Sequence, residues 1–238
     1  MTETFLSARW ENLIMANYAV SPELLQPYLP KGVELDFYEG NAYVSLVGFM
    51  FKNTRLFGIP IPLMGTFEEV NLRFYVKRVE GNTIKRGVVF INETVPYKPV
   101  AWLANKLYKE HYIAIPTKNI IDTSGAHRKI QYEWKINNNW NYIAVNGDHE
   151  KKAMLAGSVE EFIFEHYYGY TKISDELSQE YKVNHPRWLV NDVKDYDIDC
   201  DFKSMYGDDF DFLNKHTPNS VILAEGSPVT VKWKRTKF

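Results

Sequence analysis

Cysteine, excess charge and long apolar runs are all scarce in this sequence. The single cysteine among 238 residues, Cys200, excludes an internal disulfide framework and favours a reducing compartment. The formal net charge of −2 offers no basic surface for nucleic acid or an anionic membrane. No apolar run reaches the roughly 18 residues that a membrane-spanning helix needs, and no basic segment followed by an apolar run marks a secretory signal. We therefore expect a cytoplasmic protein with no nucleic-acid or membrane partner.

The signatures of common catalytic and metal sites are missing as well. The sequence contains no G-x-S-x-G elbow, no P-loop, no dinucleotide-binding fingerprint and no H-E-x-x-H motif. Six histidines are scattered without pairing at helical or strand spacing, so we expect neither a metal site nor a cofactor. The aspartates that alternate between Asp195 and Asp201 have Cys200 and Tyr206 where a calcium-binding loop needs glycine and glutamate. We expect these aspartates on the solvated face of an edge strand.

Short strand-like segments make up most of the chain. Segment Ala42–Phe51 is apolar on both faces, which predicts a strand buried on both sides, and Gly48 within it indicates a close backbone approach. Segments 128–136 and 140–145 are joined by three asparagines that are typical of a tight turn. Because a chain of this length with 45% hydrophobic residues suits one core, we expect a single domain, residues 1–238.

Helical signals are fewer. Apolar residues recur at helical spacing in segment 99–109, which predicts an amphipathic helix that packs on a sheet. Ser158 and Glu161 form a capping box for a second helix over 159–168, with Gly169 at the position of a C-terminal cap. These patterns predict an α+β fold of mostly antiparallel strands, with two or three helices against the sheet.

The segment from Thr66 to Val76 is the main candidate for a functional strand. One face is apolar, and the opposite face carries Phe67, Glu69, Asn71, Arg73 and Tyr75. If that face lines a cavity, its polar groups and aromatic rings would form a small-molecule site. Arg73 would then bind a substrate carboxylate through two parallel hydrogen bonds, and Glu69 would act as acid or base if burial raises its pKa. The same pattern also fits the wet face of an antiparallel sheet.

Two other places are candidates for chemistry. Lys118 follows Pro116 in an apolar extended stretch, where loss of water would lower its pKa and allow a Schiff base with a carbonyl. His185 is held extended by Pro186 beside Trp188, and it would shuttle protons at a bound ligand. Each also fits a structural role, as a lysine that reaches the surface or a hydrogen-bonded histidine.

Several segments, taken in order, resemble one family. They read PELLQPYLPKGVELDFYEGNAYVSLVGF at 22–49, then FEEVNLRFYV, GVVFINE, EHYYGY, VNHPRW and the closing PVTVKWK. Their order and spacing resemble the YqjF-like family of uncharacterised bacterial proteins, which is itself similar to the acetoacetate decarboxylase superfamily. The resemblance spans nearly the whole chain. It implies a double or cone-shaped antiparallel β-barrel around a buried cavity, with a few helices packed outside.

The resemblance also implies roles for single residues. It places the polar face of the central strand inside the cavity, with Glu69 at the position of a pocket glutamate in the decarboxylases. The Schiff-base lysine of those enzymes belongs to a proline-lysine-lysine motif, whose nearest counterpart here is Pro116-Thr117-Lys118. On that match Thr117 replaces the nucleophile, and Lys118 takes the place of the neighbouring lysine. The resemblance thus implies a cavity without the usual nucleophile.

Three functions stay open on the sequence alone. The leading hypothesis is a protein that binds a small organic acid or carbonyl compound in its cavity. The second is a lyase, either a decarboxylase or an aldolase-like enzyme, that acts on a small keto acid through Lys118 or Glu69. The third is a non-catalytic interaction protein whose barrel is filled by its own side chains, and a homo-oligomer is left open in each case. The residues expected to bind substrate are Phe67, Asn71, Arg73, Tyr75, His185 and Trp188.

Overall fold

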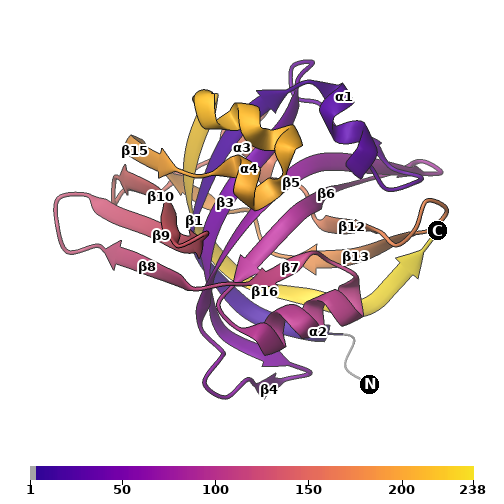
Figure 1. The fold of residues 1–238 in the computed structure, drawn as a ribbon, viewed down its shortest axis with the longest axis horizontal. Helices are drawn as coiled ribbons and strands as arrows, with labels where there is room; N and C mark the ends of the chain where they lie inside the picture. Colours follow the sequence, from indigo (N-terminus) through magenta and orange to yellow (C-terminus); the bar gives the residue numbers. More distant parts are fainter. Residues whose placement is uncertain (1–3) are drawn as a thin grey trace.

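The alternating and apolar segments of the chain form long strands in the structure, a computed structural model that describes residues 4–238. Twelve strands make one large sheet, and four make a second sheet beside it (Figure 1). The strands of the large sheet are β1 (Thr4–Val20), β2 (Glu34–Leu35), β3 (Ala42–Leu56), β4 (Ile59–Pro60), β5 (Phe67–Glu80), β6 (Thr83–Val95), β7 (Tyr112–Ala114), β11 (Lys152–Ala153), β12 (Tyr168–Lys172), β13 (Ser178–Asn184), β14 (Leu189–Asn191) and β16 (Ser220–Lys237). The strands of the second sheet are β8 (Thr117–Asp122), β9 (Arg128–Ile136), β10 (Asn139–Gly147) and β15 (Val193–Asp199).

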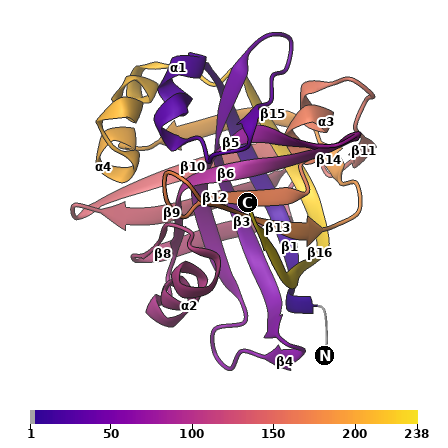
Figure 2. The ribbon, with the colours of Figure 1, turned by 90° about the vertical axis from the view of Figure 1, so that its right-hand side faces the viewer.

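Few helices accompany the sheets, as the sequence predicts. The α-helices are α1 (Pro22–Leu25), α2 (Lys98–Tyr108), α3 (Val159–Phe164) and α4 (Phe202–Tyr206), and the 3-10 helices are η1 (Gln26–Tyr28) and η2 (Asp208–Lys215). In Figure 2, α1 and α4 lie at the top left, whereas α2 lies at the lower left. No helix in residues 4–238 has the length and apolar character needed to cross a membrane.

The long strands pair mostly in antiparallel fashion. β1 pairs with β3, β3 with β5, and β5 with β6, and β12 then joins β6 in parallel. The path continues through β13 to β16, and β16 also pairs with β1. Each of these strands therefore has a hydrogen-bonded neighbour on both sides, which leaves their backbone groups few free edges.

The two faces of β5 enter different cores. The apolar face, from Val70 to Val76, packs toward the second sheet. Tyr132 and Trp134 of that sheet belong to the same buried cluster. The opposite face, whose first residue is Phe67, packs into a second cluster of buried hydrophobic residues. Its polar members are shielded too, since Glu69 is only 3% exposed. The prediction of a buried polar face is therefore confirmed, and the alternative of a wet sheet face is wrong.

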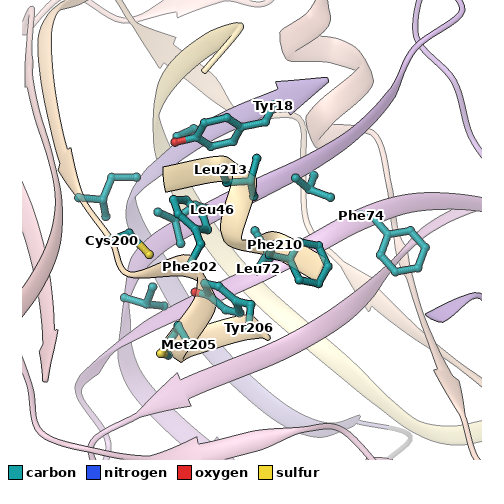
Figure 3. Packing of buried hydrophobic residues seen from close by; sticks show 14 of the residues in the cluster. Tyr18, Leu46, Leu72, Phe74, Cys200, Phe202, Met205, Tyr206, Phe210 and Leu213 are labelled. Atoms are coloured by element: carbon teal, nitrogen blue, oxygen red, sulfur yellow. The ribbon is translucent and has the colours of Figure 1, made fainter. Parts of the chain in front are cut away.

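Helix α4 and helix η2 cover the outer side of β3 and β5. Figure 3 shows the aromatic and aliphatic side chains of this cover against the strands, with Phe202 and Phe210 near Leu72. These rings are almost fully buried, which at about 25 cal/mol per Å² of apolar surface makes this contact a main source of stability. The cover keeps water from the outer face of β5.

Two local predictions from the sequence have different outcomes. The amphipathic helix expected over 99–109 is α2. The second helix begins at its Ser158 cap as expected, with Glu161 N donating to Ser158 Oγ at 3.3 Å, but it ends at Phe164 rather than at residue 168. Gly169 is therefore not a cap but a member of β12, where a Cβ atom would lie 2.1 Å from Tyr181 Cζ. Strand pairing and this close packing override the helical pattern.

Gly48 lies where β3 passes directly under the second sheet. A Cβ atom at this position would be 2.7 Å from Tyr132 Cδ2 and 3.2 Å from Ile143 Cγ2. Residues Ala42–Phe51 are all buried, as their two apolar faces predict. The glycine thus allows the two sheets to approach, and both expectations for this segment are confirmed.

Substitution Gly48→Ala is expected to lower the free energy of unfolding by roughly 1–3 kcal/mol, because the added methyl group overpacks the contact with Tyr132. Urea-induced unfolding followed by tryptophan fluorescence measures the change. Gly125→Ala is the matched control, since its Cβ atom would have an ordinary contact of 3.7 Å with His127 O. A Gly48→Ala variant as stable as this control would contradict the close approach.

Candidate functional site

A cavity of about 150 Å³ lies against the inner face of β5. Much of its wall is aromatic, with contributions from β1, β3 and the segment before β14, including Trp10, Phe49 and Trp188. The polar groups Glu69, Asn71, Arg73, Glu93, Glu110, Tyr112 and His166 also line it. An apolar hollow with a few convergent polar groups is the usual form of a small-molecule site.

Glu69 is held by hydrogen bonds on both carboxylate oxygens. Asn71 Nδ2 donates to Glu69 Oε1 at 3.0 Å, and the Tyr112 hydroxyl donates to Glu69 Oε2 at 3.0 Å. Burial raises the pKa of Glu69 from its usual 4.5 to about 7, although both hydrogen bonds and the charge of Arg73 oppose the shift. Glu69 is thus able to gain or lose a proton near neutral pH.

Glu93 faces the cavity because of a bulge in β6. Leu72 pairs with Asn92 and the next residue, Arg73, pairs with Phe90, so β6 carries an extra residue at this point. The extra residue shifts the alternation of β6, and Glu93 comes to lie directly across from Asn71. Its Oε2 atom is buried without a hydrogen-bond partner.

The pKa of Glu93 lies well above its usual range. Burial is the main cause, and the neighbouring carboxyl groups of Glu110 and Glu69 add to it. The Tyr112 hydroxyl, which donates to Glu69, also lies near enough to Glu93 to oppose this rise in pKa. Residue 112 pairs with Glu93 on the adjacent strand, and Asn105 of α2 holds its backbone through two hydrogen bonds of 2.7 and 2.9 Å.

Glu110 is a third buried carboxyl group in the cavity wall. Its Oε1 atom accepts hydrogen bonds from the Tyr181 hydroxyl at 2.8 Å and from Thr171 Oγ1 at 2.9 Å. Burial raises the pKa of Glu110 to about 7 against the effect of these two bonds. The cavity therefore contains two carboxyl groups, Glu69 and Glu110, whose charge depends on pH near neutrality, beside Glu93, whose pKa is also raised.

Arg73 is the cationic group of the cavity wall. Its Nη2 atom lies 3.4 Å from the Ile163 carbonyl oxygen and 3.6 Å from Met15 Sδ, and its Nε atom is buried without a partner. Tyr75 supports the guanidinium, with its ring centre 5.5 Å from Arg73 Cζ. Within residues 4–238, no carboxylate forms an ion pair with Arg73, so its donors remain available.

A buried histidine stands near Arg73. His166 Nε2 lies 3.2 Å from Asp36 Oδ2, and Arg86 Nε lies 2.7 Å from the same oxygen. Burial lowers the pKa of His166 and outweighs the carboxylate of Asp36, which favours the charged form. The neutral ring donates from Nε2 to Asp36, which leaves Nδ1 as a hydrogen-bond acceptor without a partner.

The structure brings most of the predicted site residues together. Glu69, Asn71, Arg73 and Phe67 all line the cavity, as do His185 and Trp188, whose rings stack with centroids 4.2 Å apart. Tyr75 does not line it, because its ring packs against Phe162 and His166 and its hydroxyl bonds with Ser45 Oγ at 2.6 Å. Tyr75 is a supporting residue rather than a wall residue.

Lys118 lies apart from the cavity. It belongs to β8 of the second sheet, where its side chain is 51% exposed and forms an ion pair of 2.8 Å with Glu133. Thr117, the position matched to the Schiff-base lysine, donates to Glu68 Oε1 at 2.5 Å on the outer side of β5. Among the described residues that line the cavity there is no lysine. The expectation that Lys118 reaches the ligand is therefore corrected.

The sequence patterns did not indicate several polar residues of the wall, among them Glu93, Glu110, Tyr112 and His166. Glu93 was hidden because simple alternation along β6 does not anticipate the bulge. Tyr112 lies in a short strand, and Glu110 and His166 follow closely after helices. Such short segments have no periodic pattern from which an inward-facing side chain could be predicted. A glutamate at the end of an apolar strand, as in GVVFINE, was the one available signal.

Comparison with known proteins identifies the family. Residues 7–228 match the family model DUF2071, which is described as an uncharacterised conserved protein. The chain belongs to the DUF2071 family. The uncharacterised protein YqjF of Bacillus subtilis (strain 168) is 26% identical to it over 190 residues, which cover 78% of this chain and 74% of YqjF. The YqjF-like resemblance is thus confirmed.

Solved structures share the fold of this DUF2071 protein. The enduracididine biosynthesis enzyme MppR complexed with pyruvate has a TM-score of 0.66 at 11% identity, covering 100% of this chain and 91% of MppR. An acetoacetate decarboxylase-like enzyme from Sphingomonas wittichii RW1 has a TM-score of 0.66 at 9% identity, with coverages of 100% and 94%. Acetoacetate decarboxylase from Legionella pneumophila has a TM-score of 0.65 at 9% identity, with coverages of 98% and 88%. The fold is therefore acetoacetate decarboxylase-like, as the sequence implied.

Because the pKa of Glu69 is raised in the folded protein, the free energy of unfolding falls as the pH rises. Below about pH 4.5 the carboxyl group is protonated in both the folded and the unfolded chain. As the pH rises from 4.5 to 7, the unfolded chain releases this proton and the folded protein retains it, so the wild type loses stability across this window. The loss amounts to roughly 3 kcal/mol.

Substitution Glu69→Gln is expected to remove this loss. The stability of the variant minus that of the wild type should therefore increase by roughly 3 kcal/mol when the pH is raised from 5 to 8. Urea unfolding at both pH values gives the difference. If the stabilities of the two proteins change in parallel with pH, the buried carboxyl group does not have the raised pKa.

Proposed function

We propose that this chain is a cytoplasmic small-molecule-binding protein, folded as one domain whose paired strands form a decarboxylase-like barrel around the cavity. The ligand is a small organic acid or carbonyl compound. The observation that carries this proposal is Arg73, a guanidinium in the cavity wall with an unpartnered Nε atom and no carboxylate ion pair within residues 4–238. A carboxylate ligand supplies the acceptors that such a group lacks.

The surrounding groups suit the same ligand. Asn71 and Glu69 follow Arg73 along the inner face of β5, so they would contact the remainder of a ligand held at Arg73. Phe67, Trp188 and His185 supply flat rings that exclude water. MppR, a neighbour in fold, was solved with pyruvate, a 2-oxo acid, which is consistent with this ligand class. A cavity of about 150 Å³ speaks against a barrel filled by its own side chains.

A lyase is the second candidate. It is favoured by the cluster of Glu69, the Tyr112 hydroxyl and Glu93, in which carboxyl groups with raised pKa values are poised for proton transfer. Such an enzyme would act by acid–base catalysis without an iminium, because no lysine lines the described cavity. Glu69 would then take or return a proton next to the ligand's carbonyl group.

A thermal-shift screen of small organic acids and ketones tests the binding proposal. A ligand at about one hundred times its dissociation constant is expected to stabilise the wild type by roughly 2.7 kcal/mol. Substitution Arg73→Ala should abolish the shift, because it removes the group that binds the carboxylate. Lys118→Ala is the control and should retain it, since Lys118 lies on the second sheet. A hit that survives in Arg73→Ala would place the ligand elsewhere.

Reductive trapping separates the proposed acid–base route from iminium chemistry. Treatment with a keto acid and borohydride is expected to leave the intact mass unchanged, because the described cavity presents no amine to the carbonyl group. An enzyme with a known Schiff-base lysine, treated in parallel, verifies the reagents. A stable adduct on a lysine of this chain would restore the iminium route.

A further inference from the structure

The cavity wall contains polar atoms that no residue of the protein satisfies. Six lining residues have a buried polar atom without a hydrogen-bond partner in the described chain: Asn71 Oδ1, Glu93 Oε2, His166 Nδ1, Arg73 Nε, Trp10 Nε1 and Thr54 Oγ1. Native proteins leave few buried polar atoms unpaired, so a group of them around one hollow indicates the polar pattern of a missing ligand. Asn71 Oδ1, Glu93 Oε2 and His166 Nδ1 are acceptors, Arg73 Nε and Trp10 Nε1 are donors, and the Thr54 hydroxyl is able to do either.

The unpaired atoms of Arg73 and Asn71 lie at different positions along β5. Arg73 lies at one end, with its guanidinium directed toward Met15 and the Ile163 carbonyl. Asn71 lies two residues away on the same face, a distance of about 7 Å along a strand, and Glu93 lies directly across from it. The cationic donor, Arg73, and two of the acceptors, on Asn71 and Glu93, are therefore in different rows of the sheet.

The acceptor end is rich in carboxyl groups. Glu93 is 2% exposed, Glu69 is hydrogen-bonded to Asn71, and Glu110 interacts electrostatically with both glutamates. Three carboxyl groups thus face a single guanidinium among the described lining residues. The described residues contain no group of His, Cys, Asp and Glu side chains arranged to hold a metal ion. The acidic end is thus suited to an organic cation.

A protonated amine matches this end in both charge and hydrogen bonding. An ammonium group has three N–H donors and no acceptor, which complements Glu93 Oε2, Asn71 Oδ1 and the carboxylate of Glu69. A second carboxylate at the same place would be repelled by these three carboxyl groups wherever they are ionised. The two ends therefore select groups of opposite charge.

We propose that the cavity binds a dipolar ligand, a short ω-amino acid whose carboxylate contacts Arg73 and whose protonated amine contacts Glu93 and Asn71. This inference rests on the proposed function, since it uses the same carboxylate contact, and it adds the chemical class of the ligand. The separation of the two rows of the sheet requires several bonds between the charged groups. An α-amino acid, with one carbon between them, is too short to reach both.

Isothermal titration with ligands of matched length tests the inference. The series is pentanoate, 5-aminopentanoate, pentanedioate and 4-oxopentanoate, with glycine as the control for spacing. On the wild type, 5-aminopentanoate is expected to bind at least about tenfold more tightly than pentanoate, and pentanedioate and glycine should bind most weakly. Arg73→Ala should weaken every member of the series.

The variant Glu93→Gln tests whether the carboxyl-rich end of the cavity causes the preference for 5-aminopentanoate over pentanoate. It keeps the size of the side chain but removes the carboxyl group that gives its proton up to pair with the bound ammonium group, so the advantage of 5-aminopentanoate over pentanoate should fall to about threefold or less. Glu133→Gln is the matched control, because Glu133 is also buried but lies on the second sheet, where it pairs with Lys118. This control should keep the full preference.

The outcomes separate the two proposals. If pentanoate and 4-oxopentanoate bind through Arg73 but 5-aminopentanoate binds no more tightly, the dipolar ligand is wrong and the proposed function stands. If no member of the series binds, both proposals are overturned. The comparison on the wild type decides these cases without any variant, so a folding defect in Glu93→Gln does not affect the result.

Discussion

The burial of both faces of β5 is the constraint on which the site depends. On the outer side, the second sheet and α4 cover the apolar residues of this strand and remove them from water. The polar face must then lie inside, among aromatic side chains. Because buried carboxyl and guanidinium groups lose their hydration, each must find a partner or change its protonation state. The raised pKa of Glu69 and the free donors of Arg73 both follow from this arrangement.

Neighbouring strands add the groups that β5 lacks. β6 contributes Glu93, β7 contributes Tyr112, and the loop between α2 and β7 contributes Glu110. These carboxyl groups share one small hollow, so Glu69 and Glu110 raise the pKa of Glu93, and Glu69 raises that of Glu110. The result is a cavity with a cationic end at Arg73 and a protonatable acidic end. This arrangement differs from an iminium site, which needs a lysine in the wall.

Local patterns predicted the elements that depend on neighbours in sequence. The buried strand around Gly48, the asparagine turn between β9 and β10 and the amphipathic α2 all follow from side-chain periodicity and backbone preference. The failures arose where distant packing decided the outcome. Helix α3 stops at Phe164 because the following residues pair with β6 and β13, and Lys118 faces away from the cavity because β8 belongs to the second sheet.

The sequence by itself determined that Glu69, Asn71 and Arg73 share one face of a strand, because side chains alternate along an extended backbone. Only the tertiary structure decided that this face is the inner one, since the outer cover comes from the second sheet and α4, which lie much later in the chain. It also decided the position of Glu93 through a bulge that shifts the alternation of β6. A bulge is a property of two paired strands, and no periodicity within one of them reveals it.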